Sequence, residues 1–281
     1  VPPEPRVLDE IETEALEGDA VASMLAGEDA GSLLATIAAL NKGHPRLSVA
    51  DAILGAVRPV LRVFRQSDAS AWEWPKRPLA DADEVREMID EFRTVPAPKN
   101  GHQAKALRKD IERLAEIDPH DAEAWSGFLA GGIGEKVRSG EFKYYVELPS
   151  ELIAAYEPIV GHALDLAYEE QRRHTAALRE LAGRFERAFR EAKRTAGAVT
   201  FDDLTMALAD ASALPDLTEV FFRLDARFRH ALLDEFQDTS VPQWRALLPI
   251  VREIAGGDPN ERSLFVVGDL KQSIYGWRGA S

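Results

Sequence analysis

Two short apolar runs near the C-terminal end of the chain, each followed at once by acidic and polar residues, constrain the fold most strongly. The first run, 230–233, is followed by Asp234-Glu235, and the second, 263–267, is followed by Gly268-Asp269. Buried parallel strands have this pattern, and α/β sheets bind ligands beyond the carboxyl ends of their strands. We therefore predict a βαβ unit with two parallel strands whose polar tips lie side by side.

Most of the remaining chain predicts helices. Ser240 and Gln243 form a capping box with a proline in the first turn, so a helix should connect the two strands. Thr200 and Asp203 mark another capped helix start, and Phe201 beside them is expected in the core. Apolar residues spaced three and four apart predict one or two long helices between Glu151 and Arg194. Further helices are predicted after Ser48 and over Asp81–Phe92, and a glycine-rich flexible loop over Trp125–Gly140.

Composition excludes several classes of protein. There are no cysteines, so disulfides and thiolate metal sites are excluded, and the six histidines are scattered without ligand spacing, so we expect no zinc site. A formal charge of −14 argues against a general polyanion-binding surface but allows a small local DNA contact. No apolar run reaches the roughly 18 residues that a membrane span needs, and no signal peptide is recognised, so we expect a cytoplasmic protein. The chain starts at Val1 without a methionine, and we expect an internal piece of a longer protein.

Two basic stretches leave alternatives open. In residues 72–78, two tryptophans stand beside Lys76 and Arg77; such a loop is either a platform for nucleic acid or a hydrophobic anchor. The cluster of Lys99, Lys105, Arg108 and Lys109 either touches phosphates or forms the solvated start of a helix.

The residues at the two strand tips suit phosphate chemistry. Asp234 is a suitable ligand for Mg²⁺, and Glu235 can activate the water that attacks a γ-phosphate, although many unrelated strands also end in acids. Gln272 can hydrogen-bond the transferred phosphate. A few residues further on, Tyr275, Trp277 and Arg278 offer the stacking and cationic surface that single-stranded nucleic acid needs.

Residues 234–239 (Asp-Glu-Phe-Gln-Asp-Thr) and 267–280 (Val-Gly-Asp-Leu-Lys-Gln-Ser-Ile-Tyr-Gly-Trp-Arg-Gly-Ala) resemble motifs II and III of superfamily 1 helicases of the UvrD type. The wording is most similar to that of AddA, the helicase-nuclease component of AddAB. Residues 197–204 are similar to the segment that precedes motif II. This resemblance implies ATP and Mg²⁺ as cofactors; the implied partners are single-stranded DNA, duplex-end DNA and an AddB-like protein. It also implies that Asp234 holds Mg²⁺, Glu235 and Gln272 are catalytic, and Gln237 and Asp269 link the motifs at the nucleotide. Tyr275, Trp277 and Arg278 would contact DNA.

The resemblance also implies an architecture, which is mainly α with a small α/β part. Residues 1–179 would form a helical insertion domain (1B-like), and residues 180–281 a partial RecA-like domain 1A with about two parallel strands. Such a sheet would leave apolar faces unpaired, which favours self-association.

The departures from the family leave its subdivision open. No Walker A lysine occurs anywhere in the chain, so we expect the chain alone to be inactive. AddA-like proteins more often have Pro at the position of Leu270 and Arg-Phe at Gly276-Trp277, where the wording here is closer to UvrD proper. The alternatives are a UvrD-type repair helicase, a non-catalytic module that binds single-stranded DNA or acts as a scaffold, and a different P-loop ATPase.

Overall fold

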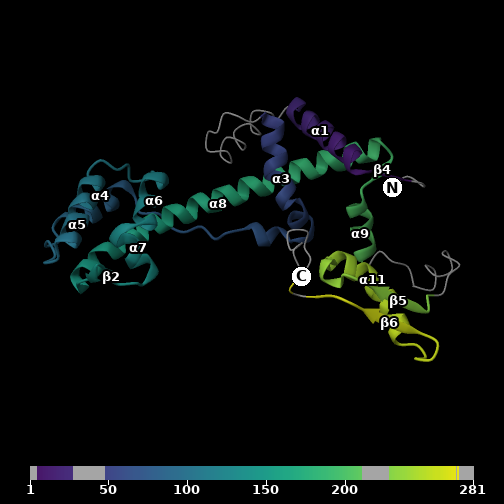
Figure 1. Cartoon of the computed structure of the whole chain (residues 1–281). Helices are drawn as coiled ribbons and strands as arrows, with labels where there is room; N and C mark the ends of the chain where they lie inside the picture. Colours follow the sequence, from purple (N-terminus) through teal and green to yellow (C-terminus); the bar gives the residue numbers. More distant parts are fainter. Residues whose placement is uncertain (1–4, 28–47, 211–227, 270, 272–281) are drawn as a thin grey trace. The chain divides into compact units, whose positions relative to one another are not determined.

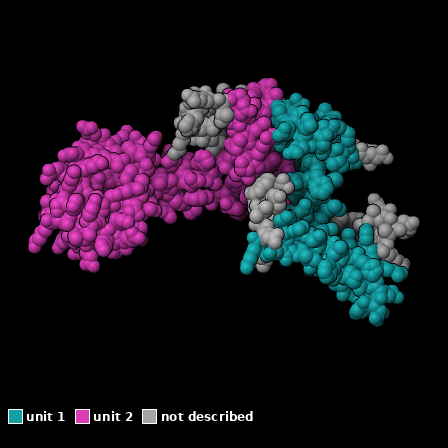
Figure 2. All heavy atoms as spheres, viewed as in Figure 1, with its two compact units in different colours: residues 1–20, 188–281 teal, residues 21–187 magenta. Residues whose placement is uncertain are grey.

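The computed structural model describes residues 5–27, 48–210, 228–269 and 271. The chain divides into two compact units: unit 1 comprises residues 1–20 and 188–281, and unit 2 comprises residues 21–187 (Figure 2). The described residues are mainly helical, with a few short strands that include two parallel pairs, which confirms the predicted fold class. The division into a 1B-like domain over 1–179 and a RecA-like part over 180–281 stays a prediction.

Unit 2 is built around the first part of one long helix (Figure 1). The elements that it contains or shares are α1 (Glu10–Ala26), α3 (Val49–Gln66), the 3₁₀ turn η1 (Ala69–Trp72), α4 (Ala82–Arg93), α5 (Gly101–Leu114), α6 (Ala122–Ala130), α7 (Gly132–Ser139), the hairpin strands β2 (Lys143–Tyr144) and β3 (Val146–Glu147), and α8 (Ser150–Thr195). The single helix α8 confirms the long helix predicted over 151–194. Its N-terminal turns pack with α4 to α7 around a core that includes Trp125, Phe128 and Tyr156.

The helix starts in unit 2 follow local capping chemistry. The side chain of Ser48 accepts a hydrogen bond from the Asp51 amide, which confirms the predicted start of α3. Asp81 and Glu84 form a capping box at the start of α4, so the helix predicted over 81–92 is confirmed as well. Each cap satisfies backbone N–H groups that a helix start leaves without intrahelical partners.

The prediction of a flexible loop over Trp125–Gly140 is wrong, because α6 and α7 occupy this segment. Its glycines serve close packing and turns. A Cβ on Gly134 would lie 2.3 Å from the carbonyl oxygen of Phe128, so α6 and α7 approach closely only because that position has no side chain. Gly132 and Gly140, with φ of 72° and 73°, adopt the left-handed conformation at the ends of α7. Glycine content alone does not distinguish such a tight helix pair from a loop.

Two polar side chains buried in the core of unit 2, those of Tyr156 and Gln103, are hydrogen-bonded. The Tyr156 hydroxyl donates to Oδ2 of Asp110 at 2.6 Å, while burial raises the pKa of that carboxyl above its ordinary value. Gln103 is buried, and its Nε2 donates to the backbone carbonyl oxygens of Tyr144, Val146 and Glu147 at 3.2, 3.2 and 3.1 Å. One amide thus fixes the β2–β3 hairpin onto α5, because an unpaired buried amide would be costly.

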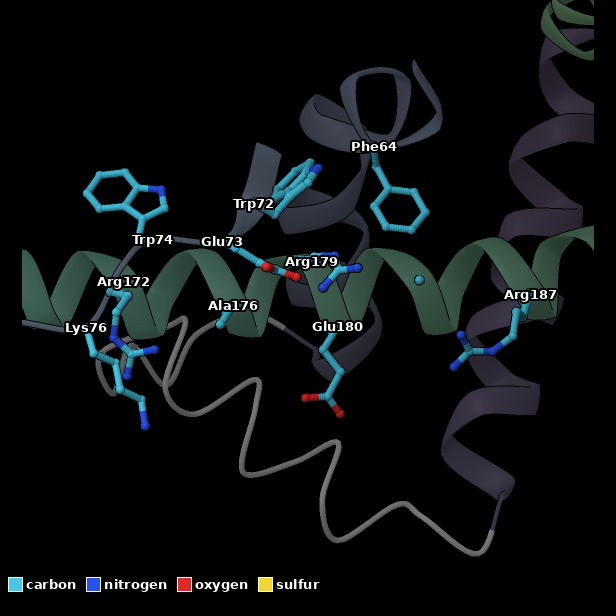
Figure 3. A pocket seen from close by; sticks show the side chains of 11 residues that line it. Phe64, Trp72, Glu73, Trp74, Lys76, Arg172, Ala176, Arg179, Glu180 and Arg187 are labelled. Atoms are coloured by element: carbon cyan, nitrogen blue, oxygen red, sulfur yellow. The ribbon is translucent and has the colours of Figure 1, made fainter. Parts of the chain in front are cut away.

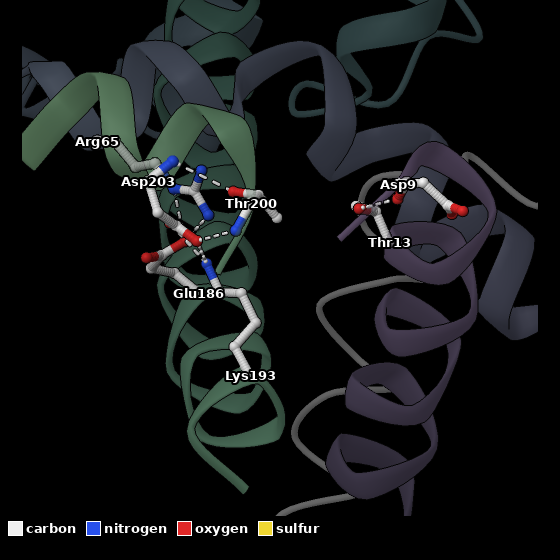
Figure 4. A network of polar contacts seen from close by, with 7 residues as sticks. All are labelled: Asp9, Thr13, Arg65, Glu186, Lys193, Thr200 and Asp203. Atoms are coloured by element: carbon white, nitrogen blue, oxygen red, sulfur yellow. Dashed lines mark hydrogen bonds and ion pairs between the residues drawn. The ribbon is translucent and has the colours of Figure 1, made fainter. Parts of the chain in front are cut away.

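An ion pair joins α3 to α8 inside unit 2. Nε of Arg65 donates to Oε2 of Glu186 at 2.8 Å, and both side chains are largely buried (Figure 4). Such a pair ties the two helices together because removing either partner would leave a buried charge without compensation.

The described helices include none with both the length and the apolar composition needed for a bilayer span.

In unit 1, the C-terminal part of α8 leads into β4 (Ala198–Val199), which pairs in parallel with β1 (Arg6–Val7), and then into α9 (Phe201–Ala209). Thr200 and Asp203 form the predicted capping box of α9. The buried Lys193 donates to both carboxylate oxygens of Asp203 at 2.6 Å (Figure 4). Burial alone would raise the pKa of Asp203, but the hydrogen bonds from Lys193 and the Thr200 amide outweigh it and lower that pKa. Phe201 is 66% exposed at the first position of α9, so its predicted core placement is wrong.

The two strands predicted from their polar tips are present in unit 1. β5 (His230–Leu233) pairs in parallel with β6 (Ser263–Val266), and Leu232 is the register partner of Phe265. The helix α11 (Val241–Ala255) connects them and packs against both strands and α9, and Ser240 and Gln243 form the predicted capping box. The strands are not buried as predicted. Leu232 is 69% and Phe265 61% exposed, because no described element covers that side of the pair.

Candidate functional site

The carboxyl end of β5 places two acidic residues at the surface. Asp234 and Glu235 follow the strand directly, and both are exposed. Glu235 has a left-handed backbone with φ 50° and ψ 41°, which non-glycine residues adopt rarely. Oδ1 of Asp234 accepts a hydrogen bond from the Glu235 amide at 2.9 Å. The chain therefore turns sharply here, and strained residues of this kind cluster at functional sites.

The parallel pairing continues past the strand ends and holds this turn in place. The Val267 amide donates to the carbonyl of Leu233 at 2.8 Å, and the Phe236 amide donates to the carbonyl of Val267 at 2.9 Å. The short 3₁₀ turn η2 (Phe236–Asp238) thus lies directly beside the segment that follows β6. As predicted from the sequence, the two polar tips lie side by side.

Gln237 connects the two tips through its side chain. It is 5% exposed, its Nε2 donates to Oε2 of Glu235, and its Oε1 accepts from the Asp269 amide at 3.0 Å. The predicted hydrogen-bond link between Gln237 and Asp269 is therefore present, whereas their role toward a nucleotide stays a prediction. Because one buried amide contacts both tips, a shift of either segment would change the position of the Glu235 carboxylate.

Gly268 makes this arrangement sterically possible. A Cβ at this position would lie 2.9 Å from Oε1 of Gln237 and 3.3 Å from Cβ of Phe236. The second tip therefore needs a residue without a side chain where it passes Gln237. On the other side of the turn, the ring of Phe236 packs edge-on against Trp244 of α11, with ring centroids 5.2 Å apart.

The structure brings together four of the predicted site residues: Asp234, Glu235, Gln237 and Asp269. The remaining predicted residues, Gln272, Tyr275, Trp277 and Arg278, lie outside the described residues. The last described residue of the second tip is Lys271, whose amide donates to Oδ1 of Asp269 at 2.9 Å.

The carboxylate oxygens after β5 could hold a Mg²⁺ ion that is also bound by phosphate oxygens of a nucleotide. Asp234 and Glu235 offer exposed carboxylate oxygens, and a buried carboxylate oxygen of Asp238 has no hydrogen-bond partner in the part of the chain that the structure describes. No group of three or more His, Cys, Asp or Glu side chains suited to a metal occurs among those residues. Mg²⁺ does not require such a cage, because it is usually held by one or two carboxylates together with waters and substrate phosphates.

Comparison with known proteins defines the class to which this fold and site belong. Residues 62–281 match the family described as the UvrD/REP helicase N-terminal domain. This match covers most of the chain, which therefore belongs to that family.

Individual relatives carry two different names. The chain is 43% identical over 93 residues to the ATP-dependent DNA helicase UvrD1 of Mycobacterium tuberculosis, covering 31% of this chain and 11% of the relative. It is 40% identical over 108 residues to a component of the ATP-dependent helicase/nuclease of Exiguobacterium sibiricum, covering 38% and 9%. It is 29% identical over 201 residues to the protein of the same name from Lysinibacillus sphaericus, covering 69% and 14%. The chain thus spans only about a tenth of the length of these relatives.

The family match starts well before the part that carries recognisable motifs. The resemblance in motifs is limited to about residues 180–281, whereas the match extends back to residue 62 near the end of α3. Residues 62–179 are mostly helical, and their sequence shows only the periodic spacing of apolar residues that is typical of amphipathic helices. Many unrelated helical proteins share this spacing. No single motif in that region would have indicated the family.

We expect the substitution Gln237→Met to separate the two tips. It removes the oxygen that accepts from the Asp269 amide while keeping a long side chain, so that amide should exchange with solvent about fivefold faster or more, for a hydrogen bond worth about 1 kcal/mol. Amide hydrogen exchange followed by NMR measures this directly. The matched control is Gln243→Met, which removes the acceptor of the Ser240 amide in the α11 capping box and should leave Asp269 unchanged. An unchanged exchange rate of the Asp269 amide in Gln237→Met would contradict the proposed link between the two tips.

Proposed function

We propose that this chain forms part of an ATP-dependent DNA helicase, with the tips of β5 and β6 as part of its ATP-hydrolysing site. Asp234 would hold Mg²⁺ that neutralises the phosphates when ATP is bound. Glu235 would orient and deprotonate the attacking water, and Gln272 would hydrogen-bond the γ-phosphate. Gln237 and Asp269 would keep both tips in register at the nucleotide. Tyr275, Trp277 and Arg278 would contact single-stranded DNA.

The observation that carries this proposal is the Gln237 link between two acidic tips at one sheet edge. In open α/β sheets this edge is where nucleotides bind. The link holds the Glu235 carboxylate by a hydrogen bond from the same amide that contacts the second tip. Membership of the UvrD/REP family supports the same assignment independently of the geometry.

For the whole protein we propose ATP-driven movement along single-stranded DNA and unwinding of duplex ends in the cytoplasm. The relatives named ATP-dependent helicase/nuclease favour a helicase-nuclease of the AddA type, with an AddB-like partner and a role in recombinational repair of double-strand breaks. The relatives named UvrD1 favour a UvrD-type repair helicase equally well. A nuclease activity would have to come from residues outside this chain.

ATP hydrolysis tests the assignment of Glu235. The 281-residue chain alone lacks a Walker A lysine, so it should hydrolyse no more ATP than its Glu235→Gln variant, with or without single-stranded DNA. In the longer protein, Glu235→Gln should lower kcat by about 10²-fold or more while the KM for ATP changes little, because a general base acts in the transition state.

The matched control in the longer protein is Glu261→Gln, an exposed acid in the connection before β6. It should leave kcat unchanged. If DNA stimulates ATP hydrolysis by the 281-residue chain and Glu235→Gln abolishes this activity, a complete site forms without a Walker A lysine. Full activity of Glu235→Gln in the longer protein would overturn the proposed function.

We also propose that the isolated chain self-associates through the uncovered side of the β5–β6 pair. Leu232 and Phe265 are register partners and largely exposed, and sheets with open apolar faces and edges tend to pair with other chains. In light scattering, the average molecular mass should rise with protein concentration. The double substitution Leu232→Lys with Phe265→Glu should make this rise smaller. Val63→Glu, which replaces a residue 58% exposed on α3, is the control. A constant monomer mass of the unmodified chain would contradict this proposal.

A further inference from the structure

A pocket of about 620 Å³ lies within unit 2, between α8 on one side and the end of α3 with the segment that follows it on the other (Figure 3). Its wall carries three aromatic side chains, from Phe64, Trp72 and Trp74. Its other side is formed by a stripe of α8 that carries three arginines, Arg172, Arg179 and Arg187. We call it the Trp–Arg pocket. Its volume lies within the range of roughly 300–1,000 Å³ that is typical of ligand pockets.

The aromatic wall is held in place by contacts within unit 2. Nε1 of Trp72 donates to Oγ of Ser67 at 2.7 Å, and its ring meets Phe64 edge-on at 6.1 Å. The ring of Trp74 packs against Tyr168 of α8 at 5.3 Å, and the Tyr168 hydroxyl donates to the carbonyl of Pro75 at 2.8 Å. The loop is therefore anchored by Tyr168, while Trp74 itself stays 38% exposed beside the pocket.

The arginine stripe follows from the helical periodicity of α8. Residues 172, 179 and 187 are separated by seven and eight positions, which returns each side chain to nearly the same face of a helix. Fifteen residues at 1.5 Å each make this stripe about 22 Å long. In Figure 3 the three aromatic side chains follow one another along the same stretch of α8.

The pocket offers cations that are not neutralised within the described part of the chain. Arg172 is fixed by two hydrogen bonds to Glu169, and it holds the pKa of that carboxyl down at about 2. No ion pair to a described residue involves Arg179, Arg187 or Lys76. The acids that line the pocket are Glu73 and Glu180, and Glu180 is paired with Arg184 at 2.7 Å. A chain with a formal charge of −14 thus concentrates positive charge beside the exposed ring of Trp74 and the half-buried ring of Trp72.

We propose that the Trp–Arg pocket binds a segment of single-stranded nucleic acid, separately from the motif III residues 275–278 and without ATP. Trp74 and Trp72 would stack on bases, and Arg179, Arg187 and Lys76 would bind the phosphates. Aromatic faces beside a cationic groove are the combination that single strands need, because every base has a π-face and every nucleotide carries a negative charge.

The dimensions favour a strand over a mononucleotide. At the stacked spacing of 3.4 Å per nucleotide, a stripe of about 22 Å accommodates about six nucleotides, and a more extended strand would have fewer over the same length. An acidic peptide would satisfy the arginines equally well, but it would supply no aromatic base to stack on the indole rings.

The test is fluorescence anisotropy of labelled dT12 titrated with the 281-residue chain at several salt concentrations without nucleotide, with rU12 as a second probe to show whether the pocket also accepts RNA. Arg179→Gln with Arg187→Gln should weaken binding and lower the slope of log K against log salt by about 1.4, which corresponds to two phosphate contacts on a single strand. Trp74→Leu should weaken binding about fivefold or more, with the salt slope retained, and Trp74→Phe should restore part of the loss.

Lys105→Gln with Arg108→Gln is the matched control, because these exposed α5 residues belong to the other basic cluster of unit 2 and the charge change is the same. It should leave both affinity and salt slope unchanged, and thermal melting checks that every variant folds. Trp277→Ala should retain most of the binding.

Three results would overturn the proposal: no measurable binding of dT12, equal losses in the pocket and control variants, or displacement of dT12 by a poly-glutamate peptide of similar length. Complete loss in Trp277→Ala with unchanged binding in the pocket variants would also overturn it, while supporting the role proposed for motif III. The hydrolysis test of Glu235 is independent of all four results.

Discussion

The parallel pairing of β5 with β6 is the constraint on which the candidate ATP site depends. Because Leu233 and Val267 are hydrogen-bonded through their backbones, the residues that follow each strand must emerge at the same edge. The Gln237 amide then joins Glu235 to the backbone of Asp269, and Gly268 leaves the space that this contact needs. A shift of one residue in register would turn each side chain to the opposite face and separate the tips. The proposed catalytic geometry therefore follows from strand register more than from any single acidic side chain.

Local chemistry explains which features could be predicted from the sequence. Caps at Ser48, Thr200 and Ser240 depend on residues three positions apart, so they were recognisable. The polar tips were recognisable because acidic and polar residues directly follow a short apolar run in each case. The tight α6–α7 pair was missed because the role of Gly134 depends on Phe128 of the preceding helix, which composition does not reveal. The exposure of Leu232 and Phe265 depends on what covers the sheet, and a strand's own residues do not specify that.

The Trp–Arg pocket shows the same limit for function. The tryptophans of residues 72–78 had two possible roles, and nothing local distinguished between them. The arginines that face them come from α8, about a hundred residues later in the chain, and the fold alone brings the two segments together. The spacing of seven and eight residues between those arginines was the available signal. In a helix this rich in charged residues, however, such a spacing also occurs on ordinary solvated faces. A net charge of −14 describes the whole surface and does not report a local cationic pocket.

The most direct test of the central claim is a disulfide across β5 and β6, which is practical because the chain has no cysteine of its own. Register partners in a parallel pair have Cα atoms within the range of about 4.4–6.8 Å that a disulfide requires. Under mild oxidation, Leu232→Cys with Phe265→Cys should therefore form an intramolecular bridge, whereas Leu232→Cys with Leu264→Cys, one residue out of register and on opposite faces, should stay reduced. Efficient bridging of the second pair and not the first would mean that the strands pair differently. The two tips would then not meet as the proposed ATP site requires.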